Sequence, residues 1–535
     1  MPAMTAPPTT PAAPAPATPA AHRRRLPIGI QTFGEIIQEG HYYVDKSGYA
    51  VDLARTGKAY FLSRPRRFGK SLFLDTLKEL FEGNVTLFKG LAAVTKWDWS
   101  KKHPVIRISF GGGVLKQREE LGQVLHKKLC DHEAQFSLPM RFADVRSRFA
   151  DLIERVHAQT GQRAVVLIDE YDKPILDNIT DSAVAIAMRE GLKDLYSVLK
   201  DADAHLRFVF LTGVSKFSKV SLFSGLNHLQ DITLMPEYSA LCGYTDEDVD
   251  TVFAPELPGL DRAQIRRWYN GYNWLGESVY NPFDLLLLFR NRKFKPYWFE
   301  TGTPTFLIQL LAERQFFTPN LSRVVAHEKL LSTFDVGNIP VEALMFQAGY
   351  LTIDSVWEIP GQMELTLKYP NLEVQASLND SLLQHLSGGL AIPGPHISRL
   401  YRLLAARDFA GLKDLFHAFF ASIPHDWYRK NQLASFEGYY ASIFYSYFAA
   451  LGLDIRLEDT TSHGRIDMAV LFNGEVLLFE FKVVELAPQG KALQQIKDKG
   501  YADKYRARGE PIHLIGVEFS RDSRNVVGFE VETVG

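Results

Sequence analysis

The chain has 535 residues, of which 46% are hydrophobic and 23% charged, and its formal net charge is −2. This composition excludes a fibrous or largely disordered protein, and the length favours about three domains. The near-neutral charge excludes nucleic-acid binding through a global positive field, so any such binding must come from local basic patches. The two cysteines, Cys130 and Cys242, are too few for a disulfide framework and predict a reducing, cytoplasmic location.

Residues 1–25 are predicted to form a disordered tail, because the first 21 are rich in Pro, Ala and Thr and lack the apolar segment of a signal peptide. The leucine-rich run FDLLLLF at 283–289 is far too short to cross a bilayer. We therefore expect no membrane association.

Residues 26–240 alternate short apolar runs with segments that carry apolar residues at helical spacing. The alternation predicts βαβ units, and so a parallel sheet covered by helices on both faces. The runs are KAYFLSR (58–64), HPVIRISF (103–110), RAVVLIDE (163–170) and LRFVFLTG (206–213).

The stretch RPRRFGKS at 64–71 follows the first of these runs. Its last three residues fit the phosphate-loop pattern G-x-x-x-x-G-K-[ST], while Arg64 stands at the first glycine position. A strand before and a helix after would put the lysine at a helix N-terminus, where anions bind. For these letters alone, an exposed basic turn is the alternative. The nucleotide-binding candidates are Arg66, Arg67, Phe68, Gly69, Lys70 and Ser71, and the serine hydroxyl would also hold Mg²⁺.

Adjacent carboxylates, Asp169 and Glu170, end the apolar run at 163–170. At the end of a buried strand Asp169 would bind nucleotide and its metal, and Glu170 would orient water as the catalytic base. An apolar strand that ends in two acids is also common by chance, so the interpretation depends on the order of the two motifs. Thr212, at the end of the run at 206–213, is a further nucleotide-binding candidate, although a plain strand-to-loop turn explains it equally well.

Residues 241–390 carry long amphipathic stretches, such as NPFDLLLLFRNRKF at 281–294, and predict a mostly helical middle module. The Gly- and Pro-rich stretch at 387–396 marks a boundary. From 391 to 535 we expect a second α/β domain. Its two apolar runs, GRIDMAVLF and GEVLLFEFKVV, are joined by Asn-Gly, the strongest short hairpin signal.

This hairpin carries Asp467 on its first strand and Glu480 and Lys482 on its second. Side chains at i and i+2 of a strand share a face, and the hairpin brings the aspartate alongside. Two carboxylates can hold Mg²⁺ and a lysine can help to position hydroxide, so all three are catalytic candidates. Glu437, near the start of an aromatic-rich helical stretch, is a candidate third metal ligand. A salt bridge across a half-exposed sheet is the alternative.

A predicted helix at 493–509 interleaves basic residues with tyrosine, which suits contact with a phosphate backbone. The nucleic-acid-binding candidates are Gln495, Lys499, Tyr501 and Lys504.

Several long runs resemble the AAA-ATPase-like family of bacterial proteins. They are LPIGIQTFGEIIQEGHYYVDKSGYAVDLARTGKAYFLSRPRRFGKSLFLDTL, LIDEYDKPI, SGLNHLQDITL and WYNGYNW…VYNPFDLL. In that family the first-glycine arginine belongs to the pattern, and the ATPase region precedes a PD-(D/E)xK nuclease-like domain. The acid on a helix, D on a strand, E-x-K on the next and a following helix with glutamine and tyrosine are similar to that nuclease fold.

The resemblance implies an α/β protein with an N-terminal P-loop NTPase-type parallel sheet, a helical middle module and a C-terminal PD-(D/E)xK-type domain. It implies ATP and Mg²⁺ as cofactors. The presence of two phosphate-handling sites in one chain predicts an ATPase whose nucleotide state gates a nuclease acting on DNA. The alternative is a nucleotide-switched interaction protein whose nuclease-like domain only binds partners. The sequence leaves homo-oligomers open.

Overall fold

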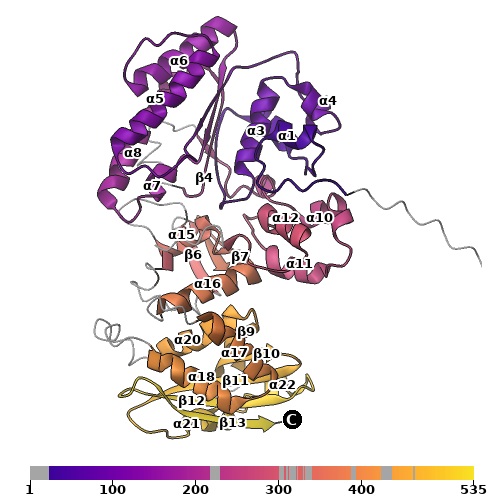
Figure 1. Cartoon of the computed structure of the whole chain (residues 1–535), viewed down its shortest axis with the longest axis vertical. Helices are drawn as coiled ribbons and strands as arrows, with labels where there is room; N and C mark the ends of the chain where they lie inside the picture. Colours follow the sequence, from indigo (N-terminus) through magenta and orange to yellow (C-terminus); the bar gives the residue numbers. More distant parts are fainter. Residues whose placement is uncertain are drawn as a thin grey trace, which may run out of the picture.

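The computed structural model describes residues 23–216, 229–299, 340–386, 393–422, 437–461 and 464–534, with short pieces between 307 and 331. Almost all of the predicted N-terminal tail lies outside these residues. Along its longest axis the chain forms an N-terminal α/β part, a middle part and a C-terminal α/β part (Figure 1). In the described parts of the chain, no helix is long and apolar enough to cross a bilayer.

The N-terminal sheet has five strands in the order β2-β3-β4-β1-β5, all parallel. Its central strands are buried on both faces and therefore read as continuous apolar runs in the sequence. The predicted parallel sheet and its four strands are confirmed. The strands are β1 (Ala59–Ser63), β2 (Val105–Ser109), β3 (Ala164–Asp169), β4 (Leu206–Gly213) and the short β5 (Gln230–Asp231).

Helices cover both faces of this sheet (Figure 1). One face carries α1 (Phe33–Gln38), α3 (Lys70–Phe81) and α4 (Ala93–Lys96), with α2 (Ser47–Thr56) packed on α3 and α4. The other carries α5 (Arg118–Gln135), α6 (Val145–Thr160) and α8 (Ser182–Asp201), with the short α7 (Lys173–Leu176). Four 3₁₀ turns complete this half of the chain: η1 (Val85–Phe88), η2 (Asp203–His205), η3 (Pro236–Tyr238) and η4 (Ala254–Glu256).

The middle part holds five described helices and a small sheet. The helices are α10 (Asp246–Thr251), α11 (Arg262–Tyr269), α12 (Pro282–Asn291), α15 (Val341–Ala348) and α16 (Leu372–Leu386). The strands β6 (Val324–His327), β7 (Thr352–Ile359) and β8 (Gln362–Lys368) form an antiparallel sheet in the order β6-β8-β7. The sequence predicted mostly helix here. The sheet was missed because β7 is largely exposed and a register shift between Ile353 and Ser355 interrupts its alternation.

The C-terminal part has a mixed five-stranded sheet in the order β13-β12-β11-β10-β9, in which only β11 and β12 run parallel. The predicted hairpin is confirmed, and Asn473 and Gly474 both adopt the positive φ that a two-residue turn requires. The strands are β9 (Asp454–Thr461), β10 (Gly464–Phe472), β11 (Glu475–Val484), β12 (Ile512–Ser520) and β13 (Val526–Val534).

Helices α17 (Pro393–Ala405), α18 (Phe409–Ser422) and α20 (Glu437–Ala450) cover one face of this sheet, and α21 (Lys491–Asp498) and α22 (Asp503–Arg506) cover the other. Helix α21 lies unusually close to β12, because a Cβ on Gly516 would come within 2.3 Å of the Leu493 nitrogen. Only glycine fits there.

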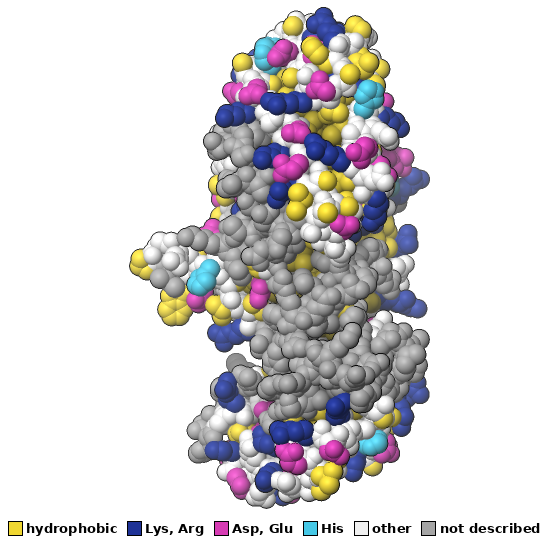
Figure 2. Space-filling view, turned by 90° about the vertical axis from the view of Figure 1, so that its left-hand side faces the viewer, with side chains coloured by type: hydrophobic (Ala, Val, Ile, Leu, Met, Phe, Trp, Pro, Cys, Tyr) yellow, Lys and Arg dark blue, Asp and Glu magenta, His cyan; other side chains and the backbone are white. Residues whose placement is uncertain are grey.

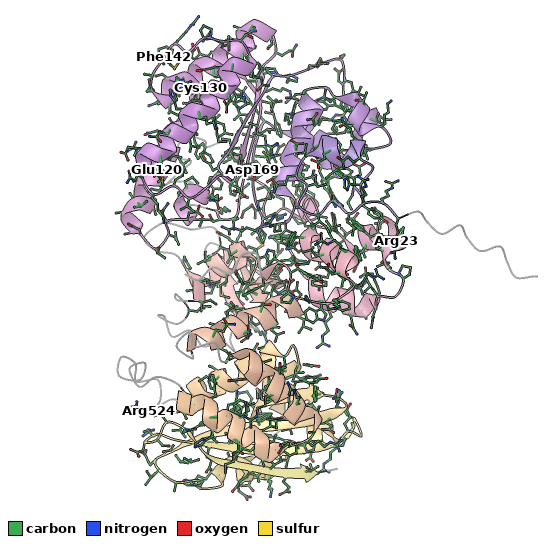
Figure 3. The ribbon with its side chains drawn as sticks, viewed as in Figure 1. Arg23, Glu120, Cys130, Phe142, Asp169 and Arg524 are labelled. Carbon is green, nitrogen blue, oxygen red and sulfur yellow. The ribbon has the colours of Figure 1, made fainter. Side chains whose placement is uncertain are left out.

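The surface of the molecule shows no separation of charge by sign on the face drawn in Figure 2. Basic and acidic side chains are interspersed over its upper and lower parts. This agrees with the near-neutral net charge. The chemistry has to be sought at the strand ends, where Asp169 lies at the end of the sheet that faces the middle part (Figure 3).

Candidate nucleotide and metal sites

Residues 64–71, here called the phosphate loop, connect β1 to α3. Arg67 and Gly69 have φ angles of 68° and 92°, both in the left-handed region, and α3 begins at the next residue, Lys70. Alternating backbone conformations of this kind turn successive N–H groups toward one point, and the helix N-terminus adds its positive end. The loop therefore has the strand–loop–helix geometry that the sequence predicted, with a backbone suited to an anion.

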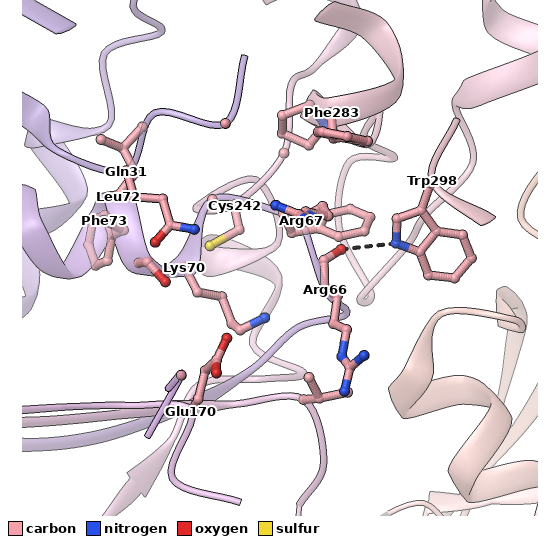
Figure 4. A pocket seen from close by; sticks show the side chains of 18 of the residues that line it. Gln31, Arg66, Arg67, Lys70, Leu72, Phe73, Glu170, Cys242, Phe283 and Trp298 are labelled. Atoms are coloured by element: carbon pink, nitrogen blue, oxygen red, sulfur yellow. Dashed lines mark hydrogen bonds between the residues drawn. The ribbon is translucent and has the colours of Figure 1, made fainter. Parts of the chain in front are cut away.

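The Lys70 ammonium folds over this loop. It is buried, and its Nζ donates to the carbonyl oxygens of Arg64 at 2.9 Å and Pro65 at 2.8 Å. Burial lowers its pKa, an effect opposed by nearby Asp169. Figure 4 shows its side chain directed toward that of Glu170. Two neutral carbonyls are weaker partners for an ammonium than phosphate oxygens, so the lysine is placed to exchange them for an anion.

The Arg64 side chain points away from the helix N-terminus. Its guanidinium is buried, donates to the carbonyl oxygens of Thr233 at 2.9 Å and Tyr238 at 3.0 Å, and lies 4.1 Å from the ring centroid of Trp274. Burial lowers its pKa to about 10. An arginine is tolerated at the first glycine position because its side chain leaves from the far side of the loop and ties it to the segment after β5.

Residues 66–68 of the loop have different roles. Arg66 and Arg67 are exposed and line a cavity, and the Arg67 guanidinium lies 4.9 Å from the ring centroid of Phe283. Phe68 is buried with its ring edge-on to those of Tyr272 and Trp274, at centroid distances of 4.7 and 5.5 Å. The phenylalanine therefore anchors the loop, while the arginines face the space in front of it.

Asp169 ends β3 and is buried. Its Oδ1 accepts a hydrogen bond of 2.9 Å from the hydroxyl of Thr212 on the neighbouring strand β4. Its Oδ2 lies 3.8 Å from an Nη of Arg107, whose other Nη is 2.6 Å from Asp75. The structure thus brings two predicted site residues together, but neither Asp169 nor Thr212 is among the residues that line the cavity, and the threonine hydroxyl is directed at the aspartate.

Glu170 lines the cavity and has a φ of 54°, which is strained for a residue with a side chain. Burial, together with the charge of Asp169, raises its pKa, as suits a group that must accept a proton. Space for the carboxylate is provided by Gly111, where a Cβ would come within 3.1 Å of Glu170 Oε2.

The cavity has a volume of about 960 Å³. Besides the phosphate loop, Gly111 and Glu170, its walls come from the N-terminal segment 27–46, from residues 172–177, 214–215 and 241–244, and from the middle part between α12 and Tyr350 (Figure 4). Most of these walls were not predicted from the sequence, since their residues, among them Gln31, Lys46 and Gln347 beside apolar side chains, belong to no common motif. Nor was Asp172 predicted, whose carboxylate accepts hydrogen bonds from Ser215 N and Oγ, both at 2.6 Å, and so shapes the loop after β4.

The second site lies where β10 separates from β11. The last ladder pair before the separation joins Met468 to Phe479, and beyond it the Asp467 carboxylate accepts the Phe481 N–H at 2.8 Å. Glu480 is buried, lies 3.4 Å from the Lys482 ammonium and accepts a hydrogen bond from Gln495 on α21. The three predicted catalytic residues are therefore gathered at one point.

The predicted helix at 493–509 is instead two short helices, α21 and α22, with Lys499 and Tyr501 in the turn between them, so the other predicted residues of this domain fall into different positions. Tyr501 is buried, and its pKa is raised by burial and then by the charge of Glu480. Lys504 forms an ion pair with Asp459, and Lys499 is exposed. Their contact with nucleic acid stays a prediction.

Glu437 is the first residue of α20, and its side chain lies outside what the structure describes. Within the described ranges no group of three or more His, Cys, Asp or Glu side chains is close enough to hold a metal ion. The candidate metal ligands that the structure describes in this domain are thus the pair Asp467 and Glu480. A third ligand has to come from the undescribed side chains, from backbone or from substrate.

The position of Gln495 depends on Glu518, a carboxylate that was not predicted as a site residue. Glu518 on β12 is buried and accepts backbone N–H groups at the start of α21, among them Lys491 at 2.7 Å and Gly490 at 3.1 Å. A carboxylate at this position satisfies the free N–H groups of the helix start and its dipole. The helix is thereby fixed with Gln495 against Glu480.

Comparison with known proteins agrees with both halves of this description. Residues 27–223 match the AAA-ATPase-like family, described as a predicted AAA-ATPase, and residues 435–529 match the PD-(D/E)XK nuclease superfamily. The chain belongs to the AAA-ATPase-like family and carries a PD-(D/E)XK nuclease superfamily domain at its C-terminus. It is 65% identical over 514 residues to a protein of Azotobacter chroococcum mcd 1, described as an uncharacterized protein in the vnfD 5′ region. That match covers 96% of this chain and all of that protein.

Proposed function

We propose that the protein binds and hydrolyses ATP in the cavity in front of the phosphate loop, and that the nucleotide state gates a Mg²⁺-dependent nuclease acting on DNA. The observation that carries the proposal is the presence of two separate sites in one chain. In one, Lys70 and Glu170 face each other across the cavity; in the other, Asp467, Glu480 and Lys482 converge.

At the first site, the backbone N–H groups of residues 66–71 would hold the phosphates, and Lys70 would exchange its two carbonyl partners for phosphate oxygens. Ser71 and Asp169 offer the hard oxygen ligands that Mg²⁺ prefers, and Thr212 orients the aspartate. Glu170, with its raised pKa, would accept a proton from the attacking water.

At the second site, the half-buried Asp467 and the buried Glu480 supply two carboxylates, which fits a divalent cation. Bound there, Mg²⁺ would stabilise negative charge on the phosphodiester. Lys482 would position the attacking water, and Gln495 holds the Glu480 carboxylate in place.

The test is cleavage of linear and circular DNA by the purified full chain in the presence of Mg²⁺ with and without ATP. Asp467→Asn keeps an oxygen that can accept the Phe481 N–H but removes the charge, and the exposed Asp498→Asn on α21 is the matched control. Metal-dependent cleavage that Asp467→Asn abolishes and Asp498→Asn leaves intact supports the proposal. Absence of cleavage under every nucleotide condition would contradict it.

One observation favours a second candidate, a nucleotide-switched interaction protein with little turnover. Arg107 lies 3.8 Å from Asp169, where a cation would compete with the metal that hydrolysis requires. In that case ATP binds without hydrolysis, and nucleotide-dependent association with partners persists after Glu480→Ala. Measurement of phosphate release and of sedimentation with and without ATP separates the two.

A further inference from the structure

Trp298 belongs to the middle part of the chain but holds the phosphate loop. Its indole N–H donates to the carbonyl oxygen of Arg66 at 3.1 Å, shown as the dashed line in Figure 4. The indole is buried and packs against the ring of Tyr350 at a centroid distance of 5.4 Å. Arg66 stands in the middle of the loop, so this bond fixes the orientation of the peptide that follows it.

A second contact from the middle part braces the same loop. Gly349 follows α15 with a φ of 92°, and a Cβ there would come within 2.8 Å of the Pro65 ring and 3.4 Å of the Trp298 ring. Only a residue without a side chain lets the end of this helix approach the loop so closely. The loop is therefore held between its own sheet and residues more than two hundred positions away.

The backbone of Trp298 is itself fixed to α16. The Glu373 carboxylate, in the first turn of that helix, accepts the N–H groups of Trp298 at 2.8 Å and Phe299 at 3.3 Å. Beside it lies Asp284 of α12, and both side chains are fully buried. Burial and the Glu373 charge raise the pKa of Asp284 well above its ordinary value, which favours its neutral form beside the glutamate.

Helix α16 continues the contact into the nuclease domain. It packs along α20, where the Gln375 amide lies 3.5 Å from the Tyr445 hydroxyl, and Leu372 packs against Gly452 just after that helix. On its other side, α20 packs on β11, with the rings of Phe444 and Phe481 at a centroid distance of 5.1 Å. The N–H of Phe481 is the one that Asp467 accepts.

We propose that Trp298 is a positioning residue for the phosphate loop and that it couples nucleotide binding to α16, and through α16 to the nuclease domain. The inference rests on the proposed function, since it requires a nucleotide in the cavity. Phosphates that bind the loop N–H groups turn the Arg66 peptide, the indole follows its carbonyl, and the Glu373 bonds pass the displacement to α16.

The experiment is hydrogen–deuterium exchange of the full chain, read on peptides from residues 372–386, with and without Mg²⁺ and a non-hydrolysable ATP analogue. Trp298→Phe keeps a ring but removes the N–H donor, and Trp357→Phe, at a side chain that is 71% exposed, is the matched control. In the wild type and the control we expect the analogue to slow exchange in α16 severalfold. Trp298→Phe should bind the analogue with an affinity lowered by no more than about tenfold, the value of one hydrogen bond, and lose the α16 response.

The outcomes distinguish this inference from the function on which it rests. A wild type that binds the analogue without any change in α16 overturns the coupling and leaves the nucleotide site intact, as does a Trp298→Phe variant with the full response. A wild type that binds no nucleotide overturns both. If Trp298→Phe does not fold, Gly349→Ala gives the same test, because its added Cβ must displace Pro65. Exchange in α16 should then change without nucleotide, and unchanged exchange would overturn the coupling.

Discussion

The Asp467 carboxylate accepts the backbone N–H of Phe481 at the point where β10 leaves β11. The residues on either side of Phe481 are Glu480 and Lys482, so this one bond brings the three polar side chains of the C-terminal site to the same place. The aspartate therefore has two roles in the proposed nuclease, as a metal ligand and as the substitute for a missing ladder bond.

For Asp467→Asn we expect cleavage to fall by more than about a hundredfold, since residues that only orient metal ligands already cost about 10–100-fold when removed. The asparagine oxygen can still accept the Phe481 N–H, so the melting temperature should stay within a few degrees of the wild type. Gln495→Ala removes the hydrogen-bond donor to Glu480, so its cleavage rate should fall by about 10–100-fold. If Asp467→Asn cleaved DNA at the wild-type rate, the Asp467 carboxylate would have no part in the reaction.

Lys70→Ala should weaken ATP binding by at least about tenfold, because charge-assisted hydrogen bonds to phosphate contribute about 1.5–3 kcal/mol. Titration calorimetry of the nucleotide measures the change, with the exposed Lys89→Ala as control. Equal affinity in the two variants would show that the loop does not bind phosphate.

Arg64→Ala should lower the free energy of unfolding by roughly 2 kcal/mol or more, since it strips the buried carbonyl oxygens of Thr233 and Tyr238 of their donor. Urea unfolding gives the value. Lysine cannot replace the forked guanidinium, so Arg64→Lys should be destabilised as well. A variant as stable as the wild type that has lost nucleotide affinity would mean that Arg64 reaches the phosphates.

The buried pair of Asp284 and Glu373 makes stability depend on pH. Because the folded pKa of Asp284 is raised above its unfolded value of 3.8, the folded chain keeps a proton that the unfolded chain loses. Stability is therefore lost as the pH rises above about 4, by up to about 1.4 kcal/mol per unit until the folded pKa is reached. Asp284→Asn cannot titrate, so its stability relative to the wild type should increase with pH in urea unfolding from pH 5 to 8. Parallel curves for the two proteins would contradict the protonated state of Asp284.

The elements that could be predicted from the sequence are those with a hydrophobic periodicity or a sequence motif. The strands of the parallel sheet are buried on both faces and read as apolar runs, and the Asn-Gly turn fixes the register that aligns Asp467 with Glu480 and Lys482. The direction of the Arg64 side chain could not be predicted from the sequence. The neighbouring residues are the same whether its guanidinium faces phosphate or donates to carbonyl oxygens behind the loop.

Long-range contacts account for the rest. The bonds of Trp298 to Arg66 and to Glu373 join positions 232 and 75 residues apart, and no spacing in the sequence relates them. Tyr501 and Lys504 were both predicted on one nucleic-acid-binding helix, yet Tyr501 lies buried between α21 and α22, and Lys504 pairs with Asp459. Tertiary packing decides whether such a residue is buried or exposed, and the residue pattern of one helical segment does not contain this information.

The central claim is that the nucleotide site controls the nuclease site, and the rate of Mg²⁺-dependent DNA cleavage as a function of ATP concentration tests it most directly. We predict that ATP changes the cleavage rate of the wild type, and that half of this change occurs at an ATP concentration equal to the measured dissociation constant for ATP. The Lys70→Ala variant should cleave at the same rate at every ATP concentration. A wild-type rate that is the same with and without ATP would contradict the account.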